Sequence, residues 1–205
     1  MSDPVLILHG LWMRAPAMQP LARRLRADGF APATFDYASR AVDPEASCRR
    51  LAERIGAFDG RPVHLVGHSL GGLLALETLT RHVGLAVGRV VCLGSPLRGA
   101  SAAAELSRHA STRWFLGRSA DLLRRGARLD RADTQIGMIA GTRRLGLGRF
   151  FARFDGPHDG TVALAETRID GLADHVAIPA THSGLIFSPQ AAVLTARFLR
   201  EGRFG

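Results

Sequence analysis

The sequence predicts an α/β protein with a doubly wound, mostly parallel sheet that carries helices on both faces. Three observations predict this class. Short apolar segments alternate with longer segments of helical periodicity. Strands and helices follow each other at spacings that require right-handed crossovers, which make neighbouring strands parallel. The 205 residues, 46% of them hydrophobic, suffice for one buried core and are too few for two, so we expect residues 1–205 to form a single domain.

The first half of the chain predicts two strand–helix units. Residues 5–8 and 32–37 are expected strands, the first because it is a continuous, partly β-branched apolar run. Residues 16–28 show helical spacing and end at a glycine. The next helix begins after Asp43 as its cap, with Pro44 at its first position. The apolar faces of the two helices are Met18, Leu21, Ala22 and Leu25, and Cys48, Leu51, Ala52 and Ile55.

The second half continues the sheet after a long interruption. Residues 70–83 form an expected helix, and Ser188 with Pro189 opens a closing helix whose buried side carries Ala191, Leu194 and Phe198. Residues at about 100–133 are helical and basic without a strand candidate, so we expect a helical, lid-like insert there. A loop is expected over residues 143–160. The remaining expected strands are residues 63–66, 90–93, 135–140 and 176–178.

One segment carries a recognisable chemical motif, because residues 67–71 read Gly-x-Ser-x-Gly between an apolar strand and an apolar helix. A sharp strand-to-helix turn strains its central residue and leaves no room for side chains beside it, which Gly67 and Gly71 provide. Ser69 would then be a nucleophile, with the amide of Leu70 at the helix start facing an oxyanion. The competing interpretation is a glycine-rich turn in which Ser69 only caps the helix.

The second oxyanion donor is expected on the loop after the first strand, where His9, Gly10, Leu11 and Trp12 follow one another. Gly10 permits a close approach, and we assign the donor to the Leu11 amide, with Trp12 as the fallback. His9 and His68 are expected to be structural hydrogen-bonding residues, and His68 to face away from substrate.

A serine nucleophile needs a base and a carboxylate that orients it. His182 is the expected base, because it follows the last strand and precedes the closing helix; His175 is the runner-up. Asp159 is the expected carboxylate, because it lies in a turn upstream of the base and gives the chain order Ser, Asp, His. Asp155 and Asp174 are the weaker candidates.

At these positions the sequence resembles the α/β-hydrolase superfamily and, more closely, its small lipase and esterase branch. The resemblance runs from residue 5 to about residue 200. It implies a minimal α/β-hydrolase fold and hydrolysis of carboxylic esters, with Ser69, Asp159 and His182 as the triad and the Leu11 and Leu70 amides as oxyanion donors. No metal or organic cofactor is implied. The matching segments are residues 8–11, 67–72, 93–96 with Gly99, 159–162 and 182–185.

The insert matches no segment that we can assign in that branch, which leaves the substrate open. We assign Trp12 and Trp114 to substrate contact. Apolar side chains interleaved with arginines make the insert a candidate for peripheral contact with an anionic membrane, and a solvated helical flap on the cleft rim is the alternative. A small-molecule or lipid ester is the expected partner. The sequence does not indicate an oligomeric state.

Other functions remain open or are disfavoured. A thioesterase, amidase or acyltransferase would use the same triad, and a non-catalytic binding protein could share the scaffold. The net charge of +9 comes from 27 arginines scattered along the chain without a nucleic-acid-binding motif, so we expect no nucleic-acid partner. Cys48 and Cys92 are expected to be reduced core residues. The N-terminal residues show no charged, apolar leader, so we expect a cytoplasmic location.

Overall fold

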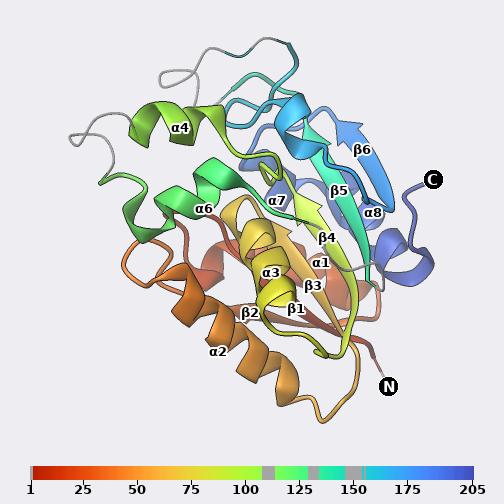
Figure 1. Cartoon of the computed structure of the whole chain (residues 1–205). Helices are drawn as coiled ribbons and strands as arrows, with labels where there is room; N and C mark the ends of the chain where they lie inside the picture. Colours follow the sequence, from red (N-terminus) through yellow and green to blue (C-terminus); the bar gives the residue numbers. More distant parts are fainter. Residues whose placement is uncertain (1, 108–113, 129–133, 146–153, 155) are drawn as a thin grey trace.

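The computed structural model describes residues 2–107, 114–128, 134–145, 154 and 156–205. Its centre is a six-stranded sheet in the order β2-β1-β3-β4-β5-β6 (Figure 1). Every neighbouring pair of these strands is parallel, which confirms the predicted α/β class. The strands are β1 (Pro4–Leu8), β2 (Ala31–Phe35), β3 (Val63–His68), β4 (Val87–Leu93), β5 (Gln135–Gly141) and β6 (Asp174–Ile178).

Helices cover both faces of the sheet. Helices α1 (Gln19–Ala27), α7 (Gly184–Phe187) and α8 (Pro189–Glu201) pack on one face. Helices α2 (Pro44–Gly56), α3 (Leu70–Arg81), α4 (Ser101–Ser107) and α6 (Ala120–Arg125) lie on the other (Figure 1). Short 3-10 helices within the described residues are Ala15–Met18, Gly117–Ser119 and Leu164–Thr167.

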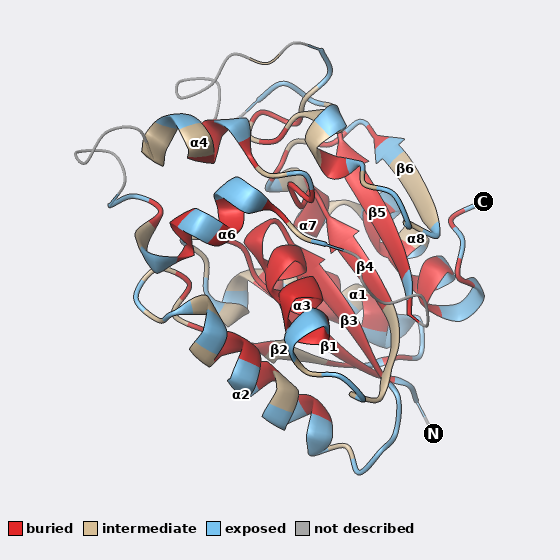
Figure 2. Ribbon diagram, in the orientation of Figure 1, coloured by how far each residue is buried: buried red, intermediate tan, exposed pale blue. Residues whose placement is uncertain are grey.

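Alternate residues of the central strands belong to two separate apolar layers, one on each face of the sheet. In β1, Leu6 and Leu8 join the layer under α2 and α3, whereas Val5 and Ile7 join the layer under α1 and α8. All four side chains are 1% exposed or less. Side chains point to alternate faces of a strand, so a sheet buried on both faces needs continuous apolar runs. Figure 2 shows β3 and β5 buried along most of their length, whereas the edge strand β6 is intermediate or exposed over most of its residues.

Several boundaries differ from the sequence prediction for local reasons. The helix expected over residues 16–28 divides into a 3-10 turn and α1, because Pro20 occupies the first turn of α1 and cannot lie further inside a helix. The strand expected to reach residue 37 ends at Phe35, and Tyr37 leaves the sheet to bind the loop after β1. The short helix α7 was not predicted, since four residues carry no periodicity.

The described part of the insert is docked against the rest of the chain. Residues 108–113 and 129–133 of the predicted range lie outside the described residues. The buried carboxylate of Glu77 in α3 accepts hydrogen bonds from Arg125 of α6 and Arg81, both at 2.7 Å. Ala100 N–H donates to the carbonyl of Leu123 at 2.9 Å. Across the described segments, none of the helices has the length and apolar character needed to cross a membrane.

Candidate active site

Ser69 sits on a strained turn between β3 and α3. Its φ of 54° and ψ of −119° are unusual for a residue with a side chain. A Cβ atom on Gly67 would lie 2.3 Å from the amide nitrogen of Gly72, and one on Gly71 would lie 2.6 Å from the carbonyl oxygen of Leu8. Both flanking glycines are therefore required by backbone contacts.

The side chain of Ser69 makes no capping hydrogen bond to α3, so the geometry gives no support to the capping interpretation. The backbone instead fixes the turn, because Ser69 N–H donates to the carbonyl of Leu93 at 2.8 Å. Leu70 is the first residue of α3, so its N–H has no acceptor within the helix. The positive end of the helix dipole lies at the same point.

His182 and Asp159 form a buried hydrogen-bonded pair. His182 Nδ1 lies 2.7 Å from Asp159 Oδ2, and Asp159 is 1% exposed. The other carboxylate oxygen accepts the N–H groups of Thr161 and Val162 at 2.9 and 2.8 Å. His182 N–H also donates to the carbonyl of Asp159 at 2.9 Å. Both the imidazole and its carboxylate are thus held by several contacts at once.

Two glycines let the strand ends approach this pair. A Cβ on Gly94, directly after β4, would lie 3.2 Å from both Asp159 Oδ2 and His182 Nδ1, and Gly94 has a φ of 58°. A Cβ on Gly141, at the end of β5, would lie 2.8 Å from the Cβ of Asp159. The pair therefore sits over the carboxyl ends of neighbouring strands, where parallel sheets place their ligands.

Ser69 and His182 line one cavity of about 610 Å³. Its polar side chains are few, and no acidic or arginine side chain among the described residues lines it. The wall is apolar and comes largely from the insert and the loop before it. These apolar residues are Pro96, Ala100, Ala102, Ala103, Leu106, Phe115, Leu116 and Leu123. Such a cavity favours an apolar group beside the serine.

Gly10, Leu11 and Trp12 also line this cavity. Among the described residues, neither Leu11 nor Leu70 donates its amide hydrogen to a backbone or side-chain acceptor. Trp12 adopts a φ of 64° and is 52% exposed. Ser69, His182 and the Leu11 amide line the cavity, and the Leu70 amide follows Ser69 directly, so the site suits a developing oxyanion.

Some predicted site residues lie elsewhere. Trp114 is 54% exposed and does not line the cavity, because its ring packs edge-on against Trp12 at 6.3 Å and beside Phe115. His175, the alternative base, lies in β6 with its Nε2 2.9 Å from the hydroxyl of Thr167. Asp174 accepts the N–H of Phe204 at 2.6 Å, away from the cavity. Asp155 lies outside the described residues.

His68 is a structural hydrogen-bonding residue, as expected, but it lines the cavity rather than facing away from it. Its ring lies 4.8 Å from that of His182, and its Nε2 lies 3.0 Å from the carbonyl oxygen of His182. Burial lowers the pKa of His68 to about 3. The ring is therefore a neutral donor that anchors the loop of His182, a partner that nothing in the local sequence indicates.

Arg40 is a residue that sequence reasoning missed. Its guanidinium lies 3.8 Å from the ring centroid of Trp12 and donates to the carbonyl of Trp114 at 2.9 Å. Its own carbonyl accepts Arg118 N–H at 3.0 Å. Arg40 thus joins the loop after β1 to the insert. Within the described residues, no group of three or more His, Cys, Asp or Glu could hold a metal ion.

Residues 5–199 match the model of the alpha/beta hydrolase family. Among solved structures, the chain is similar to the mature lipase BlEst2 of Bacillus licheniformis (22% identity, TM-score 0.80, covering 97% of this chain and 91% of that one). It is also similar to the phospholipase PlaB of Legionella pneumophila (15% identity, TM-score 0.76, covering 98% of this chain and 60% of that one). A third similar structure is the metagenomic carboxyl esterase MGS0156 (17% identity, TM-score 0.72, covering 98% of this chain and 77% of that one). These likenesses show a shared fold. A comparison with curated proteins gave no match.

Proposed function

Because the chain belongs to the α/β hydrolase family, we propose that it hydrolyses carboxylic esters through an acyl-enzyme on Ser69. The observation that carries this proposal is the buried pair of Asp159 and His182, in which His182 lines the same cavity as Ser69. An ester is the substrate class because the cavity offers a nucleophile, a base and oxyanion donors beside an apolar wall.

His182 acts as the base in the first half of the reaction. A neutral imidazole carries one hydrogen, and Asp159 keeps it on Nδ1, which leaves Nε2 able to accept a proton. Ser69 Oγ attacks the ester carbon and its proton passes to Nε2. His182 then returns this proton to the leaving alcohol, and the carbonyl forms again as an acyl ester of Ser69.

Water completes the cycle. His182 removes a proton from the water as its oxygen attacks the acyl-enzyme, and the same proton restores the Ser69 hydroxyl when the acid leaves. In both halves the negative charge on the carbonyl oxygen is stabilised by the amides of Leu11 and Leu70. Removing one such donor costs about 3 kcal/mol of transition-state stabilisation in well-studied hydrolases.

The substrate's acyl group is apolar and uncharged on this proposal. A carboxylate, phosphate or ammonium in the cavity would lose its hydration without gaining an ionic partner among the described lining residues. The leaving group is less constrained, so a thioester or amide would meet the same machinery.

Active-site labelling tests the proposal directly. We expect a fluorophosphonate probe to modify the wild-type protein on Ser69 and to leave Ser69→Ala unmodified, since the probe needs an activated hydroxyl. The same variant should lose activity on p-nitrophenyl butyrate by a factor on the order of 10⁴ or more. Mass spectrometry of the labelled peptide locates the adduct.

Ser95→Ala is the matched control. Ser95 is also buried, and it packs against Gly72, which lies in the first turn of α3. Ser95 does not line the cavity, so labelling and hydrolysis should persist in Ser95→Ala. A wild-type protein that is folded but neither labels nor hydrolyses the ester contradicts the proposal and favours a non-catalytic binding function on this scaffold.

A further inference from the structure

Arg40 lies between the two tryptophans of the chain, on the loop between β2 and α2. Its guanidinium carbon is 3.8 Å from the ring centroid of Trp12 and 5.3 Å from that of Trp114. Trp12 lines the cavity and is 52% exposed, so its side chain lies where the cavity meets the solvent. Phe115, whose ring is 5.8 Å from that of Trp12, lines the cavity as well. The cation of Arg40 therefore sits beside an aromatic rim of the cavity.

The guanidinium of Arg40 has no carboxylate partner among the described residues. Its Nη2 donates to the carbonyl of Trp114 at 2.9 Å, and its Nε is buried without an acceptor in the same part of the chain. Arg125, by contrast, is paired with Glu77 at 2.7 Å. A partly buried charge without a counterion is costly. Arg40 is thus a cation whose charge this chain leaves uncompensated within the described residues.

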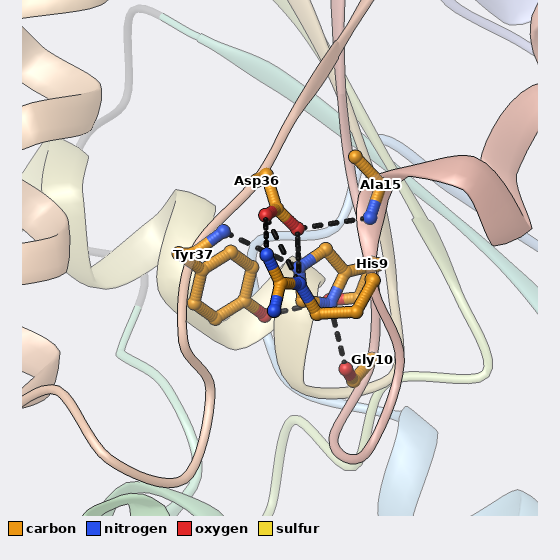
Figure 3. Close-up of polar contacts among 6 residues, drawn as sticks. His9, Gly10, Ala15, Asp36 and Tyr37 are labelled. Carbon is orange, nitrogen blue, oxygen red and sulfur yellow. Dashed lines mark hydrogen bonds and ion pairs between the residues drawn. The ribbon is translucent and has the colours of Figure 1, made fainter.

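The acidic side chains on the loop of Arg40 are engaged elsewhere. Both carboxylate oxygens of Asp36 accept hydrogen bonds from Arg14, and Oδ1 also accepts the N–H of Ala15 at 2.9 Å (Figure 3). Asp43 accepts a backbone N–H at the start of α2 as the cap of that helix. The loop therefore supplies no carboxylate to Arg40, and a counterion must come from another molecule.

A guanidinium held between aromatic rings is well placed to bind an anion. Its flat faces stack on the rings, while the N–H groups at its edge match the oxygens of a carboxylate or phosphate. The neighbouring indoles displace water, which strengthens the attraction. The cavity beside it has no acidic or arginine side chain among its described lining residues. A molecule that fits both places is apolar at one end and anionic at the other.

We propose that Arg40 is a specificity-determining residue that binds an anionic group, a carboxylate or a phosphate, on the leaving alcohol of the ester. This inference rests on the proposed ester hydrolysis. The acyl group occupies the apolar cavity beside Ser69, and the anion lies outside it, at Arg40. The substrate class is then an anionic amphiphile rather than a neutral ester.

A pair of chromogenic esters measures this preference. Both are octanoyl esters of a nitrophenol; one carries a carboxylate on its ring, and in the other a primary amide replaces that carboxylate. The readout is the ratio of kcat/KM for the anionic ester to that for the neutral ester, measured below the concentration at which either forms micelles. The ratio cancels losses of activity that affect both esters, including losses from a disturbed contact between Trp12 and the insert.

Substitutions at Arg40 separate its charge from its packing. Arg40→Gln keeps an amide donor near the Trp114 carbonyl and removes the charge, whereas Arg40→Lys keeps the charge. We expect Arg40→Gln to lower the ratio about tenfold, the effect of one charge-assisted hydrogen bond, and Arg40→Lys to retain most of the wild-type ratio. Arg124→Gln is the matched control, because it removes the same charge from an exposed position on α6 that does not line the cavity. Its ratio should equal that of the wild type.

Tryptophan fluorescence gives a second readout that needs no catalysis. The chain has two tryptophans, and both flank Arg40. Titration with octyl phosphate should therefore change the fluorescence of the wild-type protein, and Arg40→Gln should weaken this binding about tenfold. Octanol has the same alkyl chain without the anion, so its affinity should be equal in the two proteins.

Circular dichroism reports the folding of each variant. A folded Arg40→Gln protein with the wild-type ratio overturns the inference. Ratios that fall equally in Arg40→Gln and Arg40→Lys also overturn it, because the charge would then have no effect. A wild-type protein that hydrolyses neither ester removes the proposed hydrolysis, and the titration then decides the anion site by itself: equal affinities for octyl phosphate in the wild type and Arg40→Gln overturn that site.

Discussion

Asp159 decides which nitrogen of His182 carries the hydrogen. One of its oxygens faces His182 Nδ1 at 2.7 Å, and the other is occupied by the N–H groups of Thr161 and Val162. Because all three partners donate to it, the carboxylate cannot rotate without losing a hydrogen bond. The tautomer that leaves Nε2 free for a proton is therefore set by a rigid turn.

Asp159→Asn is expected to preserve the turn of residues 159–162 and to lose most of the hydrolytic activity. The Asn oxygen can still accept from Thr161 and Val162, so its NH₂ group must face His182 and forces the hydrogen onto Nε2. That tautomer cannot accept the proton of Ser69, and kcat should fall by a factor on the order of 10⁴ at neutral pH. Steady-state kinetics with p-nitrophenyl butyrate measures the loss.

Asp174→Asn is the matched control for this substitution. Asp174 also accepts backbone N–H groups, from His175 at 2.7 Å and Phe204 at 2.6 Å, but at the other end of β6. We expect wild-type kcat from it. Comparable losses in both variants would show that Asp159 acts on folding rather than on His182.

Residue-level prediction from sequence succeeded where a local pattern constrains the backbone. The glycines around Ser69 can be read directly because they remove clashes with neighbouring backbone. His68 and Arg40 could not be read in this way. Their partners in the structure, His182 and Trp114, are 114 and 74 residues away along the chain, and no local pattern encodes such contacts.

Helix α4 supplies the small side chains on one wall of the cavity. Ala102 and Ala103 line it, whereas the next residue, Ala104, does not. The cavity beside Ser69 can therefore accept an acyl chain as long as these positions remain small. Each methylene that enters the cavity should raise kcat/KM about fourfold, corresponding to about 0.8 kcal/mol.

Ala103→Phe is expected to shorten the acyl chain that the protein prefers. The added ring would fill part of the cavity, so kcat/KM on p-nitrophenyl esters should rise with chain length to a smaller maximum, with acetate and butyrate least affected. Ala104→Phe places the same ring on the same helix but away from the cavity, and its chain-length profile should match the wild type. Identical profiles for all three proteins would exclude α4 as a determinant of chain length.

Element-level prediction was strongest where periodicity was long. The strands β1 and β3 to β6 lie where short apolar runs indicate them, and the helices α2, α3 and α8 lie where helical apolar spacing indicates them. The short helices α7 and Leu164–Thr167 were not predicted from the sequence, because four residues show no periodicity and tertiary contacts decide their conformation. The Arg125–Glu77 ion pair, which holds α6 against α3, joins residues 48 positions apart and could not be predicted from the sequence either.

At the scale of the whole molecule, buried histidines set the response to acid. Burial lowers the pKa of His9, His64, His68 and His175, with neighbouring charges and hydrogen bonds adding smaller effects of both signs. In the unfolded chain each would titrate near pH 6.5. The pKa values of the Asp36 and Glu77 carboxylates are also lowered in the folded protein. Both groups titrate near pH 4 in the unfolded chain, so they change the free energy of unfolding only below about pH 4.

The free energy of unfolding should therefore begin to fall at about pH 6.5. Below that pH these histidines bind protons in the unfolded chain but stay neutral in the folded protein. Each of them can lower the free energy of unfolding by up to about 1.4 kcal/mol per pH unit, until the pH reaches its pKa in the folded protein. Urea unfolding at pH 8, 6.5, 5.5 and 4.5 measures this slope.

His64→Asn tests the contribution of one buried histidine. His64 Nδ1 accepts the N–H of Arg89 at 2.9 Å, and Asn keeps an acceptor for this N–H but cannot titrate. Its slope below pH 6.5 should be shallower than the wild-type slope; equal slopes, or a wild-type stability that stays constant down to pH 5, would contradict the burial of these rings in their neutral form.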